Sequence, residues 1–440
     1  MPRGELDGLQ LRKLRNLVAF TEANVPYHAK RFEAAGVTAD DIESLDDLRR
    51  LPFMTRDDWM QGQLDEPPYG PFLASQPDSA IRYHMTSGTT GRAPIRVLDS
   101  PKDWEWIAEM WCYGFWGFGV RPADTVFFAF GYGAFIGFWG AHYACEKLGA
   151  LVVPGGAMDT ERRLHQIVDS GATVVASTPT YALRLAQEAE RQGVDLDGSE
   201  VKRLILSGEP AGSIVATKKL IEDLWGAKAG DTAGMTELGT IMIFECEHQP
   251  GGTHIIEDHF IEEVLEPGGD RPVGYGERGE RVVTSFGRGM IPVIRYRTRD
   301  FVTKVPADVC SCGRTFDVYE GGITGRVDDM KLVRGTNVYQ SAIEAIVREH
   351  REIDEFQIVL YTVDGIRDEI DVLVEFHDAV PPDARAEIIE RLRKDLRDAH
   401  EGLRFGVEEA GAGSLPRFEL KAKRLVDRRE VKGANEGRGA

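Results

Sequence analysis

The chain has 440 residues, of which 42% are hydrophobic. This length exceeds what one hydrophobic core usually serves, so we expect two or three globular domains. The 53 basic and 72 acidic residues give a net charge of −19, which argues against non-specific binding to nucleic acid or to anionic membranes. Five cysteines are too few for a disulfide framework, and the sequence shows no signal peptide and no membrane-spanning run, so we expect a cytoplasmic protein.

The first predicted elements are helices. Apolar residues recur at helical spacing over residues 6–23, and Pro26 ends that pattern. Further along, Ser100, Pro101 and Asp103 supply an N-cap, a first-turn proline and a capping-box acid. These three residues predict that an aromatic-rich helix begins there.

Strands and helices alternate regularly after residue 124. The strand-like runs are Thr125–Phe130, Ala150–Pro154, Thr173–Ser177, Arg203–Leu206 and the approach to Asp231. The helical runs are Trp139–Leu148, Thr160–Ser170, Pro179–Arg191 and Ala211–Leu224. Such alternation predicts an α/β fold with a doubly wound, mostly parallel sheet. Sheets of this kind bind ligands at the carboxyl ends of their strands, where Ser207–Pro210 and Asp231–Glu237 fall.

The pattern of alternating strands and helices ends after about residue 240. Residues 254–304 contain short β-prone runs separated by glycines, which indicates a small barrel or a meander. A glycine-rich and charged stretch around residues 321–329 then resembles a domain boundary. We therefore divide the chain into a large domain of residues 1–325, a small α+β domain of residues 326–432 and a disordered tail of residues 433–440.

The most distinctive stretch is Thr86-Ser87-Gly88-Thr89-Thr90-Gly91-Arg92-Ala93-Pro94. Its glycines can adopt backbone angles closed to other residues, so the loop can fold its amides around an anion. The hydroxyls and the fixed charge of Arg92 add donors suited to phosphate oxygens. The spacing is not that of a Walker loop. Taken alone, the stretch is equally compatible with a surface turn.

This stretch resembles the phosphate-binding motif of the adenylate-forming superfamily, Ser/Thr-Ser-Gly-Thr-Thr-Gly-Lys-Pro. Four further stretches resemble motifs of that superfamily in the expected order: Asp231–Glu237, Tyr296–Asp300, Gly325–Val338 and Arg417–Lys423. Within the superfamily the chain is most similar to the phenylacetate-CoA ligase group. The features that carry this closer resemblance are the short length, Leu51-Pro52-Phe53, Glu209-Pro210, Glu257-Asp258-His259-Phe260 and Cys310-x-Cys312-Gly313-Arg314.

The resemblance implies binding sites for ATP, Mg²⁺ and coenzyme A. The residues that it assigns to the nucleotide and cofactors are Thr86, Ser87, Gly88, Thr89, Thr90, Gly91, Arg92, Gly208, Glu209, Pro210, Asp231, Gly234, Met235, Asp300, Arg326, Asp328, Lys331, Arg334 and Gly335. Of these, Asp300 would accept the ribose hydroxyls and Asp328 would be the pivot of the C-terminal domain. The implied catalytic residues are Thr236 near the α-phosphate, Glu237 at Mg²⁺, and Lys421 between the substrate carboxylate and the α-phosphate.

Four positions depart from the superfamily pattern. Arg92 replaces a lysine, Ala233 an aromatic residue that stacks on adenine, and Arg299 and Leu420 each a glycine. None of these changes removes a group that does chemistry. The space freed at Ala233 belongs either to the adenine site or to an enlarged acid pocket.

Residues 131–137 resemble the family segment that lines the acyl pocket. Glycines there let the backbone approach a flat ring, and aromatic walls give that ring apolar contact. The predicted substrate contacts are Tyr132, Phe135, Ile136, Gly137 and Ala233. For any one residue of the segment, packing in the core is an equally good interpretation.

Cys246, His254, Cys310 and Cys312 form a second constellation. Two cysteines one residue apart cannot easily form a disulfide, whereas three cysteines and a histidine can make a closed zinc site. His248 and His259 are rival fourth ligands. The alternative is that these are reduced thiols packed apart from one another.

The sequence therefore predicts an AMP-forming acid–thiol ligase that activates an aromatic carboxylate with ATP and transfers the acyl group to coenzyme A. One alternative is an acyl-adenylating enzyme whose acceptor is an amine, a carrier protein or another nucleophile. A second is a non-catalytic nucleotide-binding regulator, which the changes at Ala233 and Arg299 would suit. We expect small-molecule partners, no nucleic acid, no membrane, and a monomer or homodimer.

Overall fold

The computed structural model describes residues 1–86, 94–248, 252–364, 367–418 and 422–429. The helices of these parts are α1 Arg3–Asn24, α2 Pro26–Ala35, α3 Arg56–Asp65, α4 Pro101–Gly117, α5 Gly137–Leu148, α6 Thr160–Asp169, α7 Pro179–Gln192, α8 Val215–Trp225, α9 Gln340–Glu349 and α10 Pro382–Ala399. The strands of the first half are β1 Arg82–Met85, β2 Arg96–Asp99, β3 Thr125–Phe128, β4 Leu151–Pro154, β5 Val174–Ser177, β6 Arg203–Ser207 and β7 Lys228–Gly234.

The strands of the second half fall into two groups. Those of the β-rich region are β8 Ile241–Glu245, β9 Gly252–Ile255, β10 Phe260–Leu265, β11 Arg278–Ser285, β12 Tyr296–Val305, β13 Val318–Glu320 and β14 Gly325–Arg326. Those of the C-terminal part are β15 Lys331–Val333, β16 Thr336–Val338, β17 Ile353–Val363, β18 Arg367–Phe376, β19 Gly406–Glu409 and β20 Leu425–Asp427.

One long sheet forms the centre of the molecule, in the order β10-β11-β12-β13-β9-β8-β7-β6-β5-β3-β4. The strands from β7 to β4 are parallel, as the alternation of strands and helices predicts. The strands from β8 to β10 are antiparallel. The predicted β-rich region is therefore a meander that continues the main sheet, because β13 joins β12 to β9.

Helices cover the parallel part of this sheet on both faces. Alternate residues of β3 enter different cores: Val126 and Phe128 pack in one hydrophobic cluster and Phe127 in the other. The first cluster includes residues of α4 and α5, and the second includes residues of α6, α7 and α8. Because successive side chains of a strand point to opposite faces, this arrangement confirms the doubly wound α/β fold.

Several helix ends follow from local signals. The predicted start of α4 is confirmed, since Ser100 accepts the Asp103 N–H and Asp103 accepts the Ser100 N–H. Helix α8 begins at Val215 rather than at Ala211. Residues 210–212 form a 3₁₀ turn instead, and the side chain of Ser213 donates to Asp231 at 2.6 Å.

The Glu257–Phe260 motif fastens two helices to the sheet. Arg3 of α1 donates to the Glu257 carboxylate at 2.9 Å. From α4, Tyr113 donates to Asp258 at 2.7 Å and Trp106 donates to His259 Nδ1 at 2.9 Å. This part of the family resemblance is therefore structural. Among the described residues, His254 and not His259 is grouped with the cysteines.

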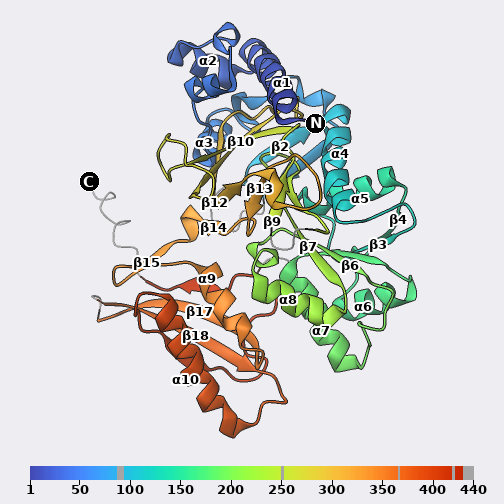
Figure 1. The fold of residues 1–440 in the computed structure, drawn as a ribbon, viewed down its shortest axis with the longest axis vertical. Coiled ribbons are helices and arrows are strands. Elements are labelled where there is room, and N and C mark those ends of the chain that lie inside the picture. The colour runs from blue at the N-terminus through green and yellow to red at the C-terminus, as the bar shows by residue number, and fades with distance from the viewer. Residues whose placement is uncertain (87–93, 249–251, 365–366, 419–421, 430–440) are drawn as a thin grey trace.

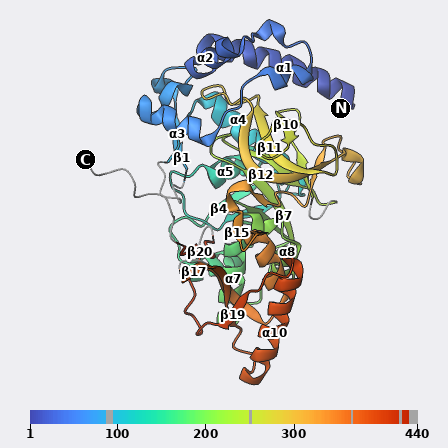
Figure 2. The same cartoon turned by 90° about the vertical axis from the view of Figure 1, so that its left-hand side faces the viewer.

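The C-terminal part has its own core beneath a sheet in the order β19-β18-β17-β20. Apolar residues of α9 and α10 pack on that sheet. Figures 1 and 2 show this part at the end of the molecule opposite α1 and α2, next to α7 and α8. No helix among the residues that the structure describes is long and apolar enough to cross a membrane.

Candidate active site

The predicted nucleotide residues lie where the main sheet meets the C-terminal part. Gly208, Glu209 and Pro210 follow the carboxyl end of β6, while Asp231, Ala233 and Gly234 lie on β7. Met235, Thr236 and Glu237 come directly after β7. Both motifs therefore lie at the carboxyl ends of parallel strands, where sheets of this kind bind ligands.

An arginine from α3 joins Glu237 to Thr86, the first residue of the predicted phosphate loop. Arg56 Nη1 donates to Glu237 Oε1 at 2.6 Å, and Arg56 Nη2 donates to Thr86 Oγ1 at 3.3 Å. Tyr296 Oη donates to the same Glu237 oxygen at 3.3 Å. Arg56 thus brings a positive charge to the point where Thr86, Glu237 and the Tyr296 motif meet. Arg56 was not predicted as a site residue, although it lies three residues after Leu51-Pro52-Phe53.

A buried ion pair between Arg288 and Asp99 lies beside the turn of Thr236 and Glu237. Arg288 contacts Asp99 with a shortest N–O distance of 2.7 Å, and neither side chain is exposed. Arg288 Nη1 also donates to the carbonyl oxygens of Thr236 at 2.9 Å and Glu237 at 3.1 Å. Arg288 was not predicted as a site residue. The only local signal is its position between Gly287 and Gly289.

Asp300 and Arg326, predicted to bind the ribose, lie in contact. Arg326 Nη1 donates to Asp300 Oδ1 at 3.1 Å, and the backbones of both residues pair between β12 and β14. Burial raises the pKa of Asp300 above its ordinary value, and the charges of Arg326 and Arg281 oppose that rise. Burial therefore disfavours the charged form of Asp300, and the two neighbouring arginines favour it.

The departure at Arg299 has a backbone consequence. Its φ is +63°, in the left-handed region that glycine adopts without steric cost. Arg299 Nη2 also pairs with Asp57 of α3 at 3.3 Å. This backbone conformation explains the glycine at this place in the superfamily motif. Arg299 adopts the conformation despite its steric cost, and its side chain contacts α3.

We expect Arg299→Gly to be more stable than Arg299→Ala by about 1 kcal/mol, since both lose the side chain and only alanine keeps the steric penalty of positive φ. Urea denaturation of the two variants measures this difference. An alanine variant at least as stable as the glycine variant would contradict the backbone explanation. The ion pair itself is partly exposed and contributes less than about 1 kcal/mol.

Asp231 is buried on β7 and bonded to its surroundings. Ser213 Oγ donates to its carboxylate at 2.6 Å, and the Asp231 N–H donates to Glu245 at 3.0 Å. Burial raises the pKa of Asp231 to about 7, although the bond from Ser213 opposes that rise. A buried carboxyl group with a raised pKa is a common feature of functional sites.

The remaining predicted cofactor residues are more dispersed. Ser87, Gly88, Thr89, Thr90, Gly91, Arg92 and Lys421 lie outside the described residues. The backbone of Asp328 is part of a 3₁₀ turn after β14. Lys331 lies on β15 and pairs with Asp427, and Arg334 pairs with Glu369. Arg334 and Gly335 both have positive φ and connect β15 to β16.

Aromatic rings surround the predicted acyl segment. Tyr132 stacks edge-on against Trp139 with ring centroids 4.7 Å apart, and its hydroxyl bonds to His142 Nδ1 at 2.8 Å. A Cβ atom at Gly137 would lie 2.2 Å from the Phe135 ring, so Gly137 makes room for that ring. Ile136 is buried in the hydrophobic core, as the packing interpretation of this segment allows.

The four predicted zinc ligands lie together. The potential ligand atoms of Cys246, His254, Cys310 and Cys312 are all within 4.8 Å of one another. Cys246 Sγ lies 3.7 Å from Cys310 Sγ, and Cys312 Sγ lies 3.4 Å from His254 Nε2. His254 Nδ1 lies 3.1 Å from the Phe316 carbonyl oxygen, an arrangement that turns Nε2 toward the thiols.

The chain is similar in sequence and fold to proteins of known function. The family model of the AMP-binding enzyme C-terminal domain matches residues 335–429. The phenylacetate-coenzyme A ligase of Escherichia coli K12 is 33% identical over 98% of this chain and 96% of its own length. A 2-hydroxyisobutyryl-CoA ligase in its postadenylation state is 29% identical with a TM-score of 0.92, covering 97% of this chain and 90% of the relative.

The same 2-hydroxyisobutyryl-CoA ligase in its thioesterification state matches less closely. There the TM-score is 0.73, although the alignment covers 98% of this chain and 91% of the relative at 30% identity. The placement of the C-terminal part described here thus resembles the postadenylation state.

The fold and the site together define an AMP-forming acid–CoA ligase. Within that class, the chain belongs to the phenylacetate-CoA ligase family. The sequence resemblance is thereby confirmed for the family and the type of enzyme.

Proposed function

We propose that this ligase activates an aromatic carboxylic acid with ATP and transfers the acyl group to coenzyme A. The observation that carries the proposal is that Thr86, Glu237 and Tyr296, from three separate motifs, meet around Arg56. The aromatic preference is supported by Phe130, Tyr132, Trp139 and their neighbours, whose ring contacts surround the acyl segment.

Two half-reactions follow from the proposed site. In the first, a carboxylate oxygen of the acid attacks the α-phosphorus of ATP, and pyrophosphate leaves with the electrons of the broken P–O bond. Lys421 would contact both reacting groups during this step. In the second, the thiolate sulfur of coenzyme A attacks the acyl carbon, and AMP leaves with the electrons of the C–O bond.

In this proposal, different residues bind the metal ion, the phosphates and the ribose. Glu237 offers the carboxylate oxygen that Mg²⁺ prefers, and the bound ion would neutralise charge on the departing pyrophosphate. Arg56 adds a fixed charge beside it, and Asp300 with Arg326 holds the ribose. We also propose that the enzyme works in the cytoplasm as a monomer or homodimer.

A screen of pyrophosphate release tests the function directly. Phenylacetate and benzoate should release pyrophosphate with ATP, and coenzyme A should convert the product to a thioester. 2-Hydroxyisobutyrate is the matched non-aromatic acid, because a ligase of similar structure is named for that acyl group. Release with 2-hydroxyisobutyrate alone would overturn the aromatic preference, and no release with any acid would overturn the ligase assignment.

We also propose that Cys246, His254, Cys310 and Cys312 hold a structural zinc ion. Tetrahedral zinc with Zn–S bonds of about 2.3 Å places its sulfur ligands about 3.8 Å apart. The 3.7 Å between the sulfurs of Cys246 and Cys310 fits that geometry. All four residues lie in or beside the β-rich region, where an ion would fasten the turn after β8 to the segment between β12 and β13.

Protein purified without chelator should therefore contain about one zinc per chain. Cys310→Ser should lower both the zinc content and the melting temperature, because a structural ion contributes to folding. Cys145→Ser is the control for zinc content, since the group of potential ligands comprises Cys246, His254, Cys310 and Cys312 and does not include Cys145. Elemental analysis that finds no zinc in the untreated protein would reject the site.

A further inference from the structure

Glu209 connects the two parts of the chain through its carboxylate. Its Oε1 accepts the backbone N–H of Thr180 at 2.7 Å, and its Oε2 accepts the backbone N–H of Ala422 at 3.1 Å. Thr180 lies in the first turn of α7, while Ala422 belongs to the C-terminal part. The Ala422 N–H is part of the peptide bond to Lys421, so this contact lies one residue from the predicted catalytic lysine.

The chemistry of these bonds favours a firm contact. An ionised carboxylate that accepts backbone N–H groups makes stronger hydrogen bonds than a neutral acceptor does. The oxygen that faces Thr180 also lies at the N-terminus of α7, where the unpaired amides and the helix dipole favour a negative charge. The anchor on α7 therefore fixes Glu209, and its second oxygen remains directed at Ala422.

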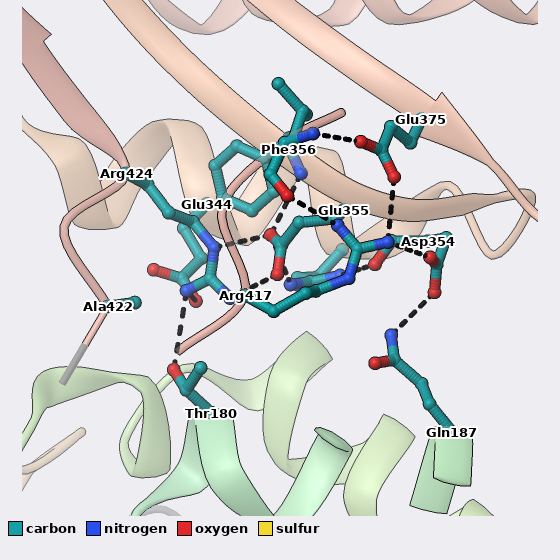
Figure 3. Close-up of polar contacts among 12 residues, drawn as sticks. Thr180, Gln187, Glu344, Asp354, Glu355, Phe356, Glu375, Arg417, Ala422 and Arg424 are labelled. Atoms are coloured by element: carbon teal, nitrogen blue, oxygen red, sulfur yellow. Dashed lines mark hydrogen bonds and ion pairs between the residues drawn. The ribbon is translucent and has the colours of Figure 1, made fainter. Parts of the chain in front are cut away.

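Arg424 strengthens the same junction two residues further along. Its side chain is buried, and Nε donates to Glu355 at 2.7 Å while Nη1 lies 3.4 Å from both Glu344 and Thr180 Oγ1. Figure 3 shows Arg424 between these carboxylates and the end of α7. Thr180 thus contributes its backbone to Glu209 and its side chain to Arg424.

A second contact crosses the junction from the middle of α7. Gln187 Nε2 donates to Asp354 Oδ1 at 2.5 Å, and Arg417 donates to the other oxygen of Asp354 at 2.6 Å (Figure 3). Three of these contacts join the C-terminal part to the large domain: Ala422 to Glu209, Arg424 to Thr180 and Asp354 to Gln187. A rotation of the C-terminal part would separate these three pairs.

We propose that Glu209 is a positioning residue of the adenylation half-reaction, which docks the Lys421-bearing segment by holding the Ala422 N–H against α7. This inference rests on the proposed function and refines the role that the family resemblance assigns to Glu209. It agrees with the closer match to the postadenylation state than to the thioesterification state of the related ligase. Glu209 acts through the position of Lys421 and need not touch the reacting atoms.

The kinetic test separates the two half-reactions. Glu209→Ala should lower the kcat of acid-dependent ATP–pyrophosphate exchange by about tenfold or more, because small misplacement of a reacting group has large effects on rate. The KM for ATP should change by less than about threefold, and thioester formation from supplied acyl-adenylate should be unchanged or faster. Glu209→Gln, which keeps one acceptor oxygen, should fall between wild type and alanine.

Asp223→Asn is the matched control at the same junction. Asp223 pairs with Arg351 at 3.0 Å, and both side chains are largely exposed, so its loss should change neither half-reaction appreciably. A raised KM for ATP with unchanged kcat in Glu209→Ala would overturn the proposal and make Glu209 a nucleotide contact. An equal loss of both half-reactions together with a lowered Tm would reduce Glu209 to a structural cap of α7.

Hydrogen–deuterium exchange tests the contact without any substrate. In Glu209→Ala, peptides that contain the amides of Thr180 and Ala422 should exchange faster than in wild type, while the α10 peptide should not change. Unchanged exchange at Ala422 would overturn the docking contact. If wild-type protein shows no acid-dependent exchange with ATP, the proposed function fails, and the deuterium measurement still decides whether Glu209 holds this segment.

Discussion

Replacement of Lys421 by alanine should lower acid-dependent pyrophosphate release by about 10²–10³-fold. An ammonium group that contacts both the attacking carboxylate and the α-phosphate stabilises charge as it moves between them, and removal of one such donor has effects of this size. Conversion of a supplied acyl-adenylate to its thioester should stay near the wild-type rate. The expectation assumes that the C-terminal domain turns between the half-reactions and carries Lys421 away from the site.

Rapid-quench assays of each half-reaction measure the two rates separately. Lys394→Ala is the control, because Lys394 is exposed on α10 of the same domain and its loss should leave both rates unchanged. Equal loss of both half-reactions in Lys421→Ala would contradict the alternation of the domain. Retention of pyrophosphate release would remove Lys421 from the catalytic residues altogether.

The sequence predicts the central sheet well because its signals are local. The strands from β3 to β6 are short, mostly apolar runs. The helices between them carry their own start and stop residues, as Thr178 and Gly193 do for α7. The pairing of β13 with both β12 and β9 has no such signal. It depends on contacts between distant segments, and for that reason the same residues are compatible with a barrel or a meander.

The candidate site divides in the same way. Asp300 and Arg326 were each predicted from a motif, and their contact follows from strand pairing between β12 and β14. Arg56 lies 181 residues from Glu237, so no spacing in the sequence could pair them. An arginine at the start of a helix is an ordinary surface residue until tertiary structure gives it a partner.

Arg288→Met should lower the free energy of unfolding by about 3–5 kcal/mol, because it leaves the buried Asp99 carboxylate without its partner. Neither side chain of the pair is exposed, so water cannot replace the lost contact. The carbonyl oxygens of Thr236 and Glu237 lose their donor as well, and the KM for ATP should rise with the loss of order in that turn. Urea denaturation and ATP kinetics measure the two effects.

The pH dependence of stability and two further variants identify why Arg288→Met is destabilised. Burial already raises the pKa of Asp99, and Arg288 lowers it, so removal of the arginine should move that pKa further above its unfolded value of about 4. A raised carboxyl pKa means that stability falls as pH rises above about 4, so Arg288→Met should lose more stability at pH 8 than at pH 5. Adding Asp99→Asn to Arg288→Met should restore part of the lost stability at pH 8. The control is Arg162→Met, which removes an exposed pair with Asp159 and should change stability by less than about 1 kcal/mol. A loss in Arg288→Met that is independent of pH and not relieved by Asp99→Asn would show that packing, rather than the unpaired carboxylate, is responsible.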